Sequence, residues 1–541
     1  MKMSKRVIPV ILSVIMLLAL AAACGSTNNP ASSPAATNPA APTPAAPGPV
    51  VPEPPPDDAR FAEHIDIIVD SNNIAVINPY SPAGNTGPTQ WTLTLIHDRL
   101  VENLGDGVYG QMLATSWDTD DWQTYRFNLR DDVYFHNGER FTAEDIRFTV
   151  SAAQDNPGTI GFDRWRFVES VTVLDSHTVE IVLQRVHIDF LFDISTPPAG
   201  IVNERAFRED PDTWTWIGTG PYQVIEFATN DYVTVQRFDD YWGETPITSS
   251  LTLRFVPEPS ARLVMLQNRE SDVCFSITPE DLAILEADPN FRVFPVIFNA
   301  PNVLGFNMAD PLMSDRNFRM AAMHALNSEE IAMVAAGNWA DPVLDGNVWG
   351  YATEFRHNNI ERLPFDLDLA RQYLDASPYN GEEIEIAAAI QTNILAAEII
   401  QQQLAQAGIV TRINSMDTPA FISYIAFANN QSQLHVFASS FTLSAIGSTS
   451  NIYYPGAGNN RTSHDNPYVT ELIDRARGIG DLEERRALFM HLQEYIADDP
   501  PHINVFWRLN GVAAINGIDG MRLGYDAVQY NLRGIYRVLE D

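Results

Sequence analysis

The chain has 541 residues, with 34 Lys and Arg against 69 Asp and Glu, and a formal charge of −35. At about 100 to 200 residues per domain, this length predicts roughly two to four domains, each with its own hydrophobic core. A content of 45% hydrophobic and 19% charged residues indicates a globular chain. The acidic excess argues against nucleic-acid partners and against adhesion to anionic lipid, and two cysteines are too few for a disulfide framework.

The N-terminal segment has the layout of a secretory signal. Lys2, Lys5 and Arg6 precede an uncharged run at 7–23 that ends in small residues. A basic start, an apolar centre and small residues before the cleavage point are typical of exported proteins. The alternative is a transmembrane anchor, but 17 residues with Pro9 among them stand at the lower limit for spanning a membrane.

Leu20 to Cys24 (Leu-Ala-Ala-Ala-Cys) resembles the lipobox of bacterial lipoproteins, although Ala21 stands where leucine is commoner. The resemblance implies a lipoprotein signal peptide at 1–23 and a lipidated Cys24 at the start of the mature chain. Without the signal, 31 of the 34 basic residues and all 69 acidic residues remain, a formal charge of −38, and every remaining basic residue is arginine. A chain without lysine excludes Schiff-base and lysine-nucleophile enzymes.

The stretch after Cys24 has the composition of a tether. Residues 25–57 are rich in Ser, Asn, Ala and Pro, with 11 prolines among 33 residues. Such a sequence buries little apolar surface and favours the extended polyproline conformation, in which about 3.1 Å per residue gives a reach of up to about 100 Å. We therefore expect residues 24–57 to hold a folded body away from a membrane as a lipidated tether.

The first half of the body carries mostly strand signals. Two β-branched runs at 171–174 and 178–183 flank a polar turn and predict a hairpin. The stretches 232–238 and 251–255 alternate between apolar and polar residues, which predicts two further strands. Residues 142–145 (Thr-Ala-Glu-Asp) begin a helical pattern with a capping-box pair.

Helical patterns dominate the second half. Apolar residues recur with the helical period at 318–336, 367–374, 393–407, 469–477 and 482–497. Gly408 ends the third of these helices, and 409–413 follows as a strand. Alternation of helices and strands predicts an α/β chain with at least two lobes.

The motifs that could carry catalysis have simpler structural explanations. Residues 105–110 match a dinucleotide-binding glycine pattern, but no helix start follows them, so a glycine-rich turn is expected. The eleven His never stand three or four residues apart, which excludes a helical metal pair. Cys274 is interpreted as a small buried residue rather than a nucleophile. We therefore expect no catalytic residues, no metal ligands and no cofactor.

Several blocks of sequence occur in the order that is typical of one family. They are 100–104, 113–117, 125–138, 141–145, 217–222, 238–242, 268–272, 306–307, 318–322 and 404–409. In this order the chain resembles the large extracytoplasmic solute-binding proteins of ABC importers, family 5, the oligopeptide, dipeptide and nickel class. The resemblance extends over roughly residues 64–541.

The resemblance implies a two-lobed α/β fold of the periplasmic-binding-protein type II, in its large form with an extra inserted domain. The expected ranges are 58–92, 206–303 and 508–541 for lobe I, 93–205 for the inserted domain and 304–507 for lobe II. Two chain crossings near Leu304 and Trp507 would form the hinge. Closure of the lobes would bury the ligand and present it to the permease.

Several of the blocks have a structural interpretation that does not depend on the family. The turn at 136–138 uses Gly138 for a positive φ, and the turn at 218–222 is set by two glycines and a proline. Arg319 follows Asp315 by four residues, so an (i, i+4) ion pair is expected. These residues are therefore assigned to the fold rather than to ligand binding.

The resemblance is weakest at the ligand. Peptide-binding members hold the peptide ammonium with an Asp in a Trp-x-Ala-Asp segment. Here the matching segment, 441–444, is Phe-Thr-Leu-Ser, with Ser444 at the position of the Asp. The surrounding stretch, 435–464, contains no Asp or Glu and is rich in Ser, Thr, Asn and aromatic residues. This composition suits neutral oligosaccharides about as well as peptides, unless a carboxylate from elsewhere substitutes.

The expected function is a receptor that binds a small solute, without chemistry, and delivers it to an ABC permease. Hypothesised ligand-binding residues are Asn78, Tyr80, Phe441, Ser444 and Trp507, chosen by family position and by side chains able to stack or to hydrogen-bond. Expected partners are the ligand, the permease subunits and, through the lipid on Cys24, a bacterial membrane, with no nucleic acid; the receptor is expected to be a monomer. The rivals are a secreted hydrolase and a peptide-signalling receptor.

Overall fold

The computed structural model describes residues 59–70, 76–84, 86–297, 299–342, 347–524 and 530–539. The predicted signal peptide, the lipidated Cys24 and the tether lie outside these ranges. Within them, no helix combines the length and apolar character that crossing a membrane requires. The names lobe I, inserted domain and lobe II are kept below for the proposed ranges.

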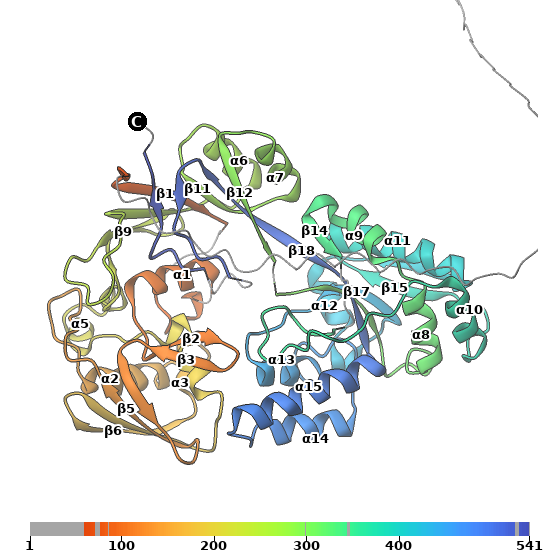
Figure 1. The fold of residues 1–541 in the computed structure, drawn as a ribbon, viewed down its shortest axis with the longest axis horizontal. Coiled ribbons are helices and arrows are strands. Elements are labelled where there is room, and N and C mark those ends of the chain that lie inside the picture. Colours follow the sequence, from red (N-terminus) through yellow and green to blue (C-terminus); the bar gives the residue numbers. More distant parts are fainter. Residues whose placement is uncertain are drawn as a thin grey trace, which may run out of the picture. The chain divides into compact units, whose positions relative to one another are not determined.

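A single strand, β18 (His502–Ile515), joins two groups of strands into one sheet of twelve strands. Its first residues pair with β13 and β14, from 502 to 508. Its last residues pair with β11 and β12, from 509 to 515. Figure 1 shows β18 passing from the neighbourhood of β17 to that of β11 and β12. The backbone of both lobes is thus hydrogen-bonded to the same strand.

The main path of this sheet has the order β16-β15-β17-β13-β18-β11-β1-β10-β9-β8. The strands of lobe II are β13 (Asn302–Phe306), β14 (Ala340–Pro342), β15 (Ile384–Ala388), β16 (Thr411–Ser415) and β17 (Leu434–Ala438). Those of lobe I are β1 (His64–Val69), β8 (Tyr222–Ala228), β9 (Tyr232–Arg237), β10 (Ser250–Phe255), β11 (Val273–Ile277) and β12 (Phe291–Ile297). Parallel pairs link β1 with β10 and β11, and β15 with β16 and β17.

The inserted domain has a separate antiparallel sheet with the order β4-β5-β7-β6. Its strands are β4 (Ala114–Asp118), β5 (Thr124–Leu129), β6 (Val168–Asp175) and β7 (Thr178–Leu183). β6 and β7 form the hairpin that was predicted from their β-branched runs. Two short pairs complete the strands: β2 (Val101–Gly105) with β3 (Val108–Gln111), and β19 (Ile518–Asp519) with β20 (Tyr536–Arg537).

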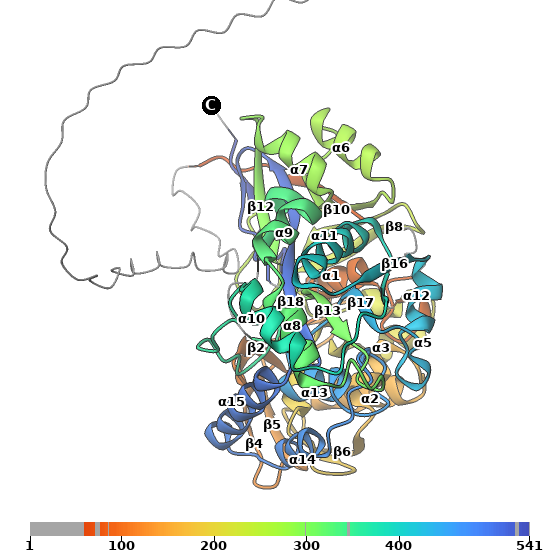
Figure 2. The ribbon, with the colours of Figure 1, turned by 90° about the vertical axis from the view of Figure 1, so that its right-hand side faces the viewer.

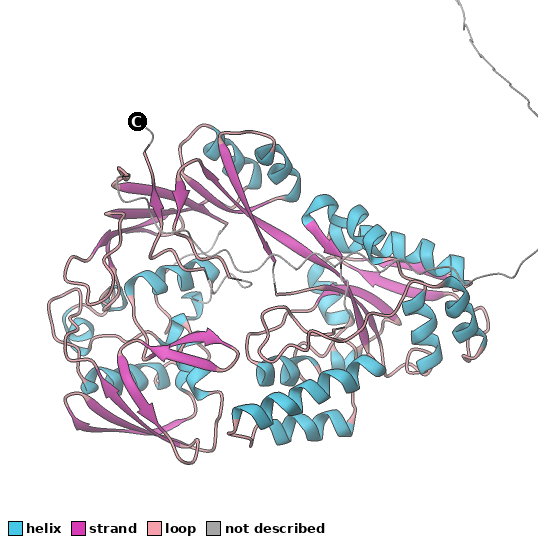
Figure 3. Cartoon of the chain, viewed as in Figure 1, coloured by secondary structure: helices cyan, strands magenta, loops and turns pink. Residues whose placement is uncertain are grey.

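Helices accompany the strands in each part of the chain (Figure 3). Before β13 they are α1 (Gly87–Ile96), α2 (Ala143–Gln154), α3 (Ile160–Trp165), α4 (Phe190–Ile194), α5 (Glu204–Glu209), α6 (Pro259–Gln267) and α7 (Pro279–Glu286). After it they are α8 (Arg316–His324), α9 (Ser328–Ala336), α10 (Leu367–Asp375), α11 (Gln391–Ala407), α12 (Thr418–Tyr424), α13 (Ala445–Ile452), α14 (Pro467–Ala476) and α15 (Leu482–Asp498). In lobe II, α9 packs against α11, β14 and β18 (Figure 1), and Figure 2 shows α9 beside α11 and β18 from the side.

Short 3₁₀ turns connect some of these elements. They are η1 (Pro82–Gly84), η2 (Pro197–Ala199), η3 (Trp214–Trp216), η4 (Gly337–Trp339) and η5 (Phe427–Asn429). The mixture of strands and helices confirms the predicted α/β class.

The predicted helix at 318–336 is wrong in one respect, because the structure divides it into α8 and α9. Ala325 ends α8, and Asn327 caps α9 by accepting a hydrogen bond from the backbone N–H of Glu330 at 3.3 Å. An Asn side chain competes with the helical backbone for hydrogen bonds, so it begins a helix more readily than it continues one. The helical period of apolar residues continues across the break between α8 and α9, so the pattern alone does not reveal that break.

Two predicted helix boundaries are confirmed by their caps. Thr142 and Asp145 form the capping box that begins α2. Gly408 ends α11 with φ of 100°, a left-handed conformation that glycine adopts without a steric penalty.

The predicted ion pair between Asp315 and Arg319 is wrong. Asp315 instead caps α8, where its Oδ1 accepts from the N–H of Phe318 at 2.9 Å. Arg319, with 1% of its side chain exposed, donates to the carbonyl of Met313 at 2.8 Å and pairs with Asp499. The N-cap hydrogen bond turns the Asp315 carboxylate toward the backbone, so a carboxylate from the end of α15 takes its place.

Separate hydrophobic cores underlie the parts of the chain. The lobe I core contains Cys274, whose side chain is fully buried as predicted. α1 contributes Trp91 and Ile96 to the same core, so the proposed boundary at residue 93 falls inside a helix of lobe I. The core of the inserted domain also contains Tyr80 and Trp214, which lie outside the proposed range 93–205.

Replacing Asp499 with Asn should destabilise lobe II by about 1 to 3 kcal/mol, because it leaves a buried guanidinium without its counter-charge. The measurement is urea denaturation followed by circular dichroism. The matched control is Asp368→Asn, which removes an exposed partner of Arg371 at 3.0 Å and should cost less than about 0.5 kcal/mol. Equal denaturation midpoints for the two variants would contradict this assignment.

Candidate ligand-binding cleft

A cleft of about 980 Å³ lies where lobe I, the inserted domain and lobe II meet. Lobe I and the residues after α1 contribute Thr94, Arg99, Arg522, Leu523, Gly524, Tyr530, Asn531 and Arg533. The inserted domain contributes 102–106, Phe192 and 195–197, and lobe II contributes 351–356, Asn358, Leu443, Arg486 and Met490. Its volume falls at the upper end of the usual range for small-molecule sites, about 300 to 1,000 Å³.

The tip of the β2–β3 hairpin brings the inserted domain against α15. Gly105, Asp106 and Gly107 all have positive φ, at 94°, 50° and 76°, which makes the tight turn expected from the glycine-rich sequence. A Cβ at Gly107 would lie 2.7 Å from a methyl carbon of Leu482. Glycine is therefore required there both by conformation and by close packing, and the hairpin reaches the lobe II wall of the cleft.

The lobe II wall is a loop held in a strained conformation. Phe355 has φ of 57°, which is unusual for a bulky residue. Buried Gln493 holds the loop, because its Nε2 donates to the carbonyl of Phe355 at 2.8 Å and its Oε1 accepts from the N–H of His357 at 2.8 Å. The Phe355 ring stacks on Phe489 with the ring centres 5.8 Å apart. These contacts fix the direction of the neighbouring Glu354 and Arg356.

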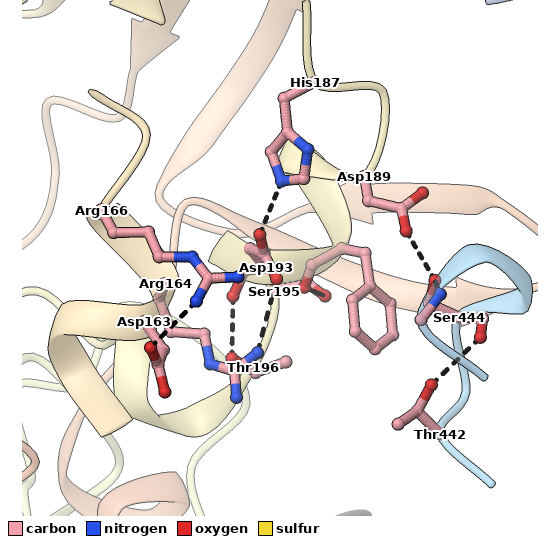
Figure 4. Close-up of polar contacts among 12 residues, drawn as sticks. Asp163, Arg164, Arg166, His187, Asp189, Asp193, Ser195, Thr196, Thr442 and Ser444 are labelled. Atoms are coloured by element: carbon pink, nitrogen blue, oxygen red, sulfur yellow. Dashed lines mark hydrogen bonds and ion pairs between the residues drawn. The ribbon is translucent and has the colours of Figure 1, made fainter. Parts of the chain in front are cut away.

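Beside the cleft, one hydrogen bond joins the inserted domain to lobe II (Figure 4). Ser444 caps α13 by accepting from the N–H of Gly447 at 2.8 Å, and its hydroxyl donates to Oδ2 of Asp189 at 2.6 Å. Burial raises the pKa of the Asp189 carboxyl, and the hydrogen bond from Ser444 opposes that rise. The structure thus places a carboxylate from another segment next to the position where the sequence lacks one.

The neighbouring carboxylate, Asp193, is fully partnered. Its Oδ2 accepts a hydrogen bond from Nε2 of His187 at 2.8 Å, and Arg164 lies 3.4 Å from its Oδ1 (Figure 4). Asp189, by contrast, accepts a hydrogen bond from Ser444, and the charges of His187 and Arg485 act on it without a direct ion pair.

Glu354 is a buried carboxyl that faces the cleft with little compensation. Only 7% of the residue is exposed, and among the described residues its carboxyl accepts one hydrogen bond, from the N–H of Ala445 at the limiting distance of 3.5 Å. Burial raises the pKa of Glu354 to about 8, the negative charge of Asp189 adds to the rise, and Arg485 opposes it. At neutral pH this carboxyl is therefore largely protonated.

Arginines gather in the cleft although the chain is acidic. Its lining contains five Arg, at 99, 356, 486, 522 and 533, against three carboxylates, at 102, 106 and 354. The whole chain has the opposite ratio, with 34 basic and 69 acidic residues. The local charge therefore differs in sign from the charge of the whole molecule.

None of the five residues predicted to bind ligand is among the described residues that line the cleft. Asn78 is half-buried and its side chain accepts from the N–H of Tyr80 at 2.7 Å. Tyr80 is buried and stacks on Trp214 with ring centres 5.5 Å apart.

Phe441 and Ser444 are buried on the lobe II side, two residues before and one residue after Leu443, which lines the cleft. Trp507 is fully buried in the middle of β18, and its ring lies 4.4 Å from that of the cleft residue Tyr351. The five therefore do not converge on one point, and their assignment as ligand contacts stays a prediction.

Sequence reasoning missed the residues that do line the cleft, such as Arg99, Glu354 and Arg356. Each stands in a loop or just after a helix, without a motif of its own. The signal that could have been used is the local excess of arginine, but it appears only when segments from three parts of the chain are brought together. Within the described ranges, no group of three His, Cys, Asp or Glu is placed to hold a metal ion.

Comparison with known proteins decides the family. The sequence profile of the bacterial extracellular solute-binding proteins, family 5 (middle region), matches residues 109–464. The chain belongs to this family. The predicted resemblance is confirmed, and so is the expectation of a binding protein rather than an enzyme.

Individual relatives agree with this membership. A protein of Brucella ovis named as an ABC transporter peptide-binding protein is 30% identical over 369 residues, 64% of this chain and 68% of its own. The glutathione-binding protein GsiB of Shigella dysenteriae is 23% identical over 472 residues, 82% of this chain and 89% of its own.

A solved structure shows the same fold. The ABC transporter substrate-binding protein CtaP of Listeria monocytogenes superimposes with a TM-score of 0.76 at 22% identity, over 88% of this chain and all of CtaP. The predicted periplasmic-binding-protein fold is therefore confirmed. This solute-binding protein acts outside the cytoplasm, as family membership requires.

A pH titration tests the state of Glu354. Its pKa of about 8 in the folded protein exceeds the ordinary 4.5, so the folded state binds the proton more tightly. The free energy of unfolding should then fall as pH rises from about 4.5 to about 8, by up to about 5 kcal/mol from this group. Glu354→Gln should remove that part of the fall and be the more stable protein at pH 8.5.

The measurement is chemical denaturation of the ligand-free protein between pH 5 and pH 8.5. Glu169→Gln, on the exposed face of β6, is the matched control and should follow the natural protein at every pH. A Glu354→Gln variant that is less stable at pH 8.5 than the natural protein would show that Glu354 is ionised and well partnered.

Proposed function

We propose that this solute-binding protein captures a peptide, or a solute of similar size, in the cleft and presents it to an ABC permease. The observation that carries the proposal is the cleft of about 980 Å³ walled by three segments that are far apart in the chain. Because both lobes pair with β18, the cleft walls can move against each other while the sheet stays continuous. The printed names of the relatives, peptide-binding and glutathione-binding proteins, support a peptide-like ligand.

The lobe ranges given above, with a hinge near Leu304 and Trp507, form part of this proposal. The pairing of β18 supports it, since the partner of this strand changes from lobe II to lobe I between residues 508 and 509. The ligand contacts of Phe441 and Trp507 are part of it as well. They would act through neighbouring wall residues, Leu443 two positions after Phe441 in the chain and Tyr351 against the ring of Trp507.

We also propose that a lipid on Cys24 anchors the receptor to the outer face of the cytoplasmic membrane. The Leu-Ala-Ala-Ala-Cys sequence and the proline-rich residues that follow it support this anchor. One lipidated cysteine joined to a long tether would concentrate the receptor near its permease without restricting its orientation.

A thermal-shift screen tests the ligand class. The protein without residues 1–57 should be stabilised by di- to pentapeptides, and a ligand at 100 times its Kd should add about 2.7 kcal/mol. Neutral trisaccharides at the same concentration are the control. Stabilisation by the trisaccharides alone would replace the peptide proposal with an oligosaccharide receptor.

Replacement of the anchor cysteine tests the localisation. Cys24→Ala in the full chain should release the receptor from the membrane fraction into the soluble exported fraction, because the lipid attachment point is lost. Ser26→Ala, two residues away, should leave the receptor in the membrane fraction. Membrane retention of the Cys24→Ala protein would indicate that 7–23 stays in place as an anchor.

A further inference from the structure

Arg99 is a cation that faces the cleft without a partner. It lies directly after α1 and Asp98, is half-buried, and lines the cleft. Its Nε is buried and makes no hydrogen bond, and no side-chain hydrogen bond or ion pair joins its guanidinium to a described residue. An unpaired charge of this kind costs free energy in the empty protein, which a ligand of opposite charge would recover.

The carboxylates around Arg99 are engaged elsewhere or too far away to pair with it. Asp98 is fully buried; its Oδ1 accepts from Arg533 at 2.8 Å and its Oδ2 from Trp242 at 2.8 Å. Glu102 also lines the cleft and acts on Arg99 through its charge, but makes no ion pair with it. Burial, and next the positive charge of Arg533, lower the pKa of Arg99 to about 10, so it stays charged at neutral pH.

Arg533, which also lines the cleft, has the contacts of a structural arginine and serves as a comparison for Arg99. Its Nε donates to the carbonyl of Thr94 at 2.6 Å, Nη1 donates to Asp98, and Nη2 donates to the carbonyl of His97 at 2.9 Å. All three nitrogens are thus used to join the C-terminal segment to α1. Arg99, one residue after Asp98, has none of these contacts, so the fold does not account for it.

Building on the proposed receptor function, we infer that Arg99 binds a carboxylate of the solute, so that the cleft selects small organic acids, including peptides with a free carboxylate, over neutral solutes. A guanidinium presents two parallel N–H donors that match a carboxylate. The lining has a positive excess, because five Arg stand against the two carboxylates at 102 and 106, while the third acidic side chain, Glu354, is largely protonated at neutral pH. One unpartnered guanidinium in such surroundings suits a single negative charge better than the double charge of phosphate.

Matched ligands and variants test this inference by thermal shift and calorimetry. The probes are a pool of N-acetylated tripeptides of Ala, Gly, Leu, Ser and Phe with free carboxylates, the same pool as carboxamides, succinate, citrate, neutral trisaccharides and inorganic phosphate. The variants are Arg99→Gln, Arg99→Lys and, as a surface control, Arg208→Gln, whose side chain is 72% exposed on α5.

The natural protein and Arg208→Gln should be stabilised by the carboxylate pool, and the carboxamide pool should bind about 10- to 100-fold more weakly, as expected for the loss of a charge-assisted hydrogen bond. Arg99→Gln should bind the two pools equally, at the affinity of the carboxamides. Arg99→Lys should keep part of the preference, because it keeps the charge and loses the paired donors.

The ligand-free proteins provide a second measurement. Because Arg99 has no partner, Arg99→Gln should melt at the same temperature as the natural protein or higher, whereas Arg533→Gln should melt lower. A lower melting temperature of Arg99→Gln would show that Arg99 has a structural role and would overturn the inference.

The outcomes separate this inference from the proposed function. Equal binding of the carboxylate and carboxamide pools by the natural protein would overturn the carboxylate site and leave the peptide receptor standing. Stabilisation by trisaccharides or by phosphate alone would overturn both. Absence of stabilisation by every carboxylate probe would also overturn the assignment of Arg99.

Discussion

Both lobes of this solute-binding protein depend on the backbone hydrogen bonds of one strand. β18 gives its first residues to the sheet of lobe II and its last residues to the sheet of lobe I. A strand cannot slip by one residue without exchanging its two faces, so the register of each lobe constrains that of the other. Trp507 is fully buried near the point where the partners of β18 change from lobe II to lobe I, and its ring contacts the ring of the cleft residue Tyr351. The wall of the cleft is therefore tied to the strand about which the lobes would turn.

The charges near the cleft divide into those that the fold uses and those that it leaves over. Asp98 and Arg533 neutralise each other and join α1 to the C-terminal segment. Asp189 is bound by Ser444 and connects the inserted domain to lobe II. Glu354 and Arg99 are left with weak compensation or none. A ligand gains the most binding free energy at groups of this kind, because it supplies a hydrogen-bond or charge partner that the folded chain does not provide.

The fold could be predicted further than the site, and the reason is physical. Strands such as β6, β7, β9 and β10 can be predicted from β-branched runs or from the alternation of apolar and polar residues. Thr142 and Gly408 mark helix ends, the first by its capping hydroxyl and the second by its tolerance of positive φ. Local signals fail where two local options compete, as at Asp315, which can cap a helix or pair with Arg319 and does the former. The cleft has no local signal, since Arg99, Glu354 and Arg486 meet only after three segments have folded.

The burial of Cys274 has a consequence for experiments on the motion of the lobes. It is the free cysteine of the described residues, its side chain is fully buried, and burial raises the pKa of its thiol to about 12, so it is a poor nucleophile. In a protein that starts at residue 58, two cysteines introduced on opposite walls of the cleft would be the thiols that a maleimide dye reaches. The natural sequence thus provides a silent background for measuring the opening and closing of single molecules by energy transfer.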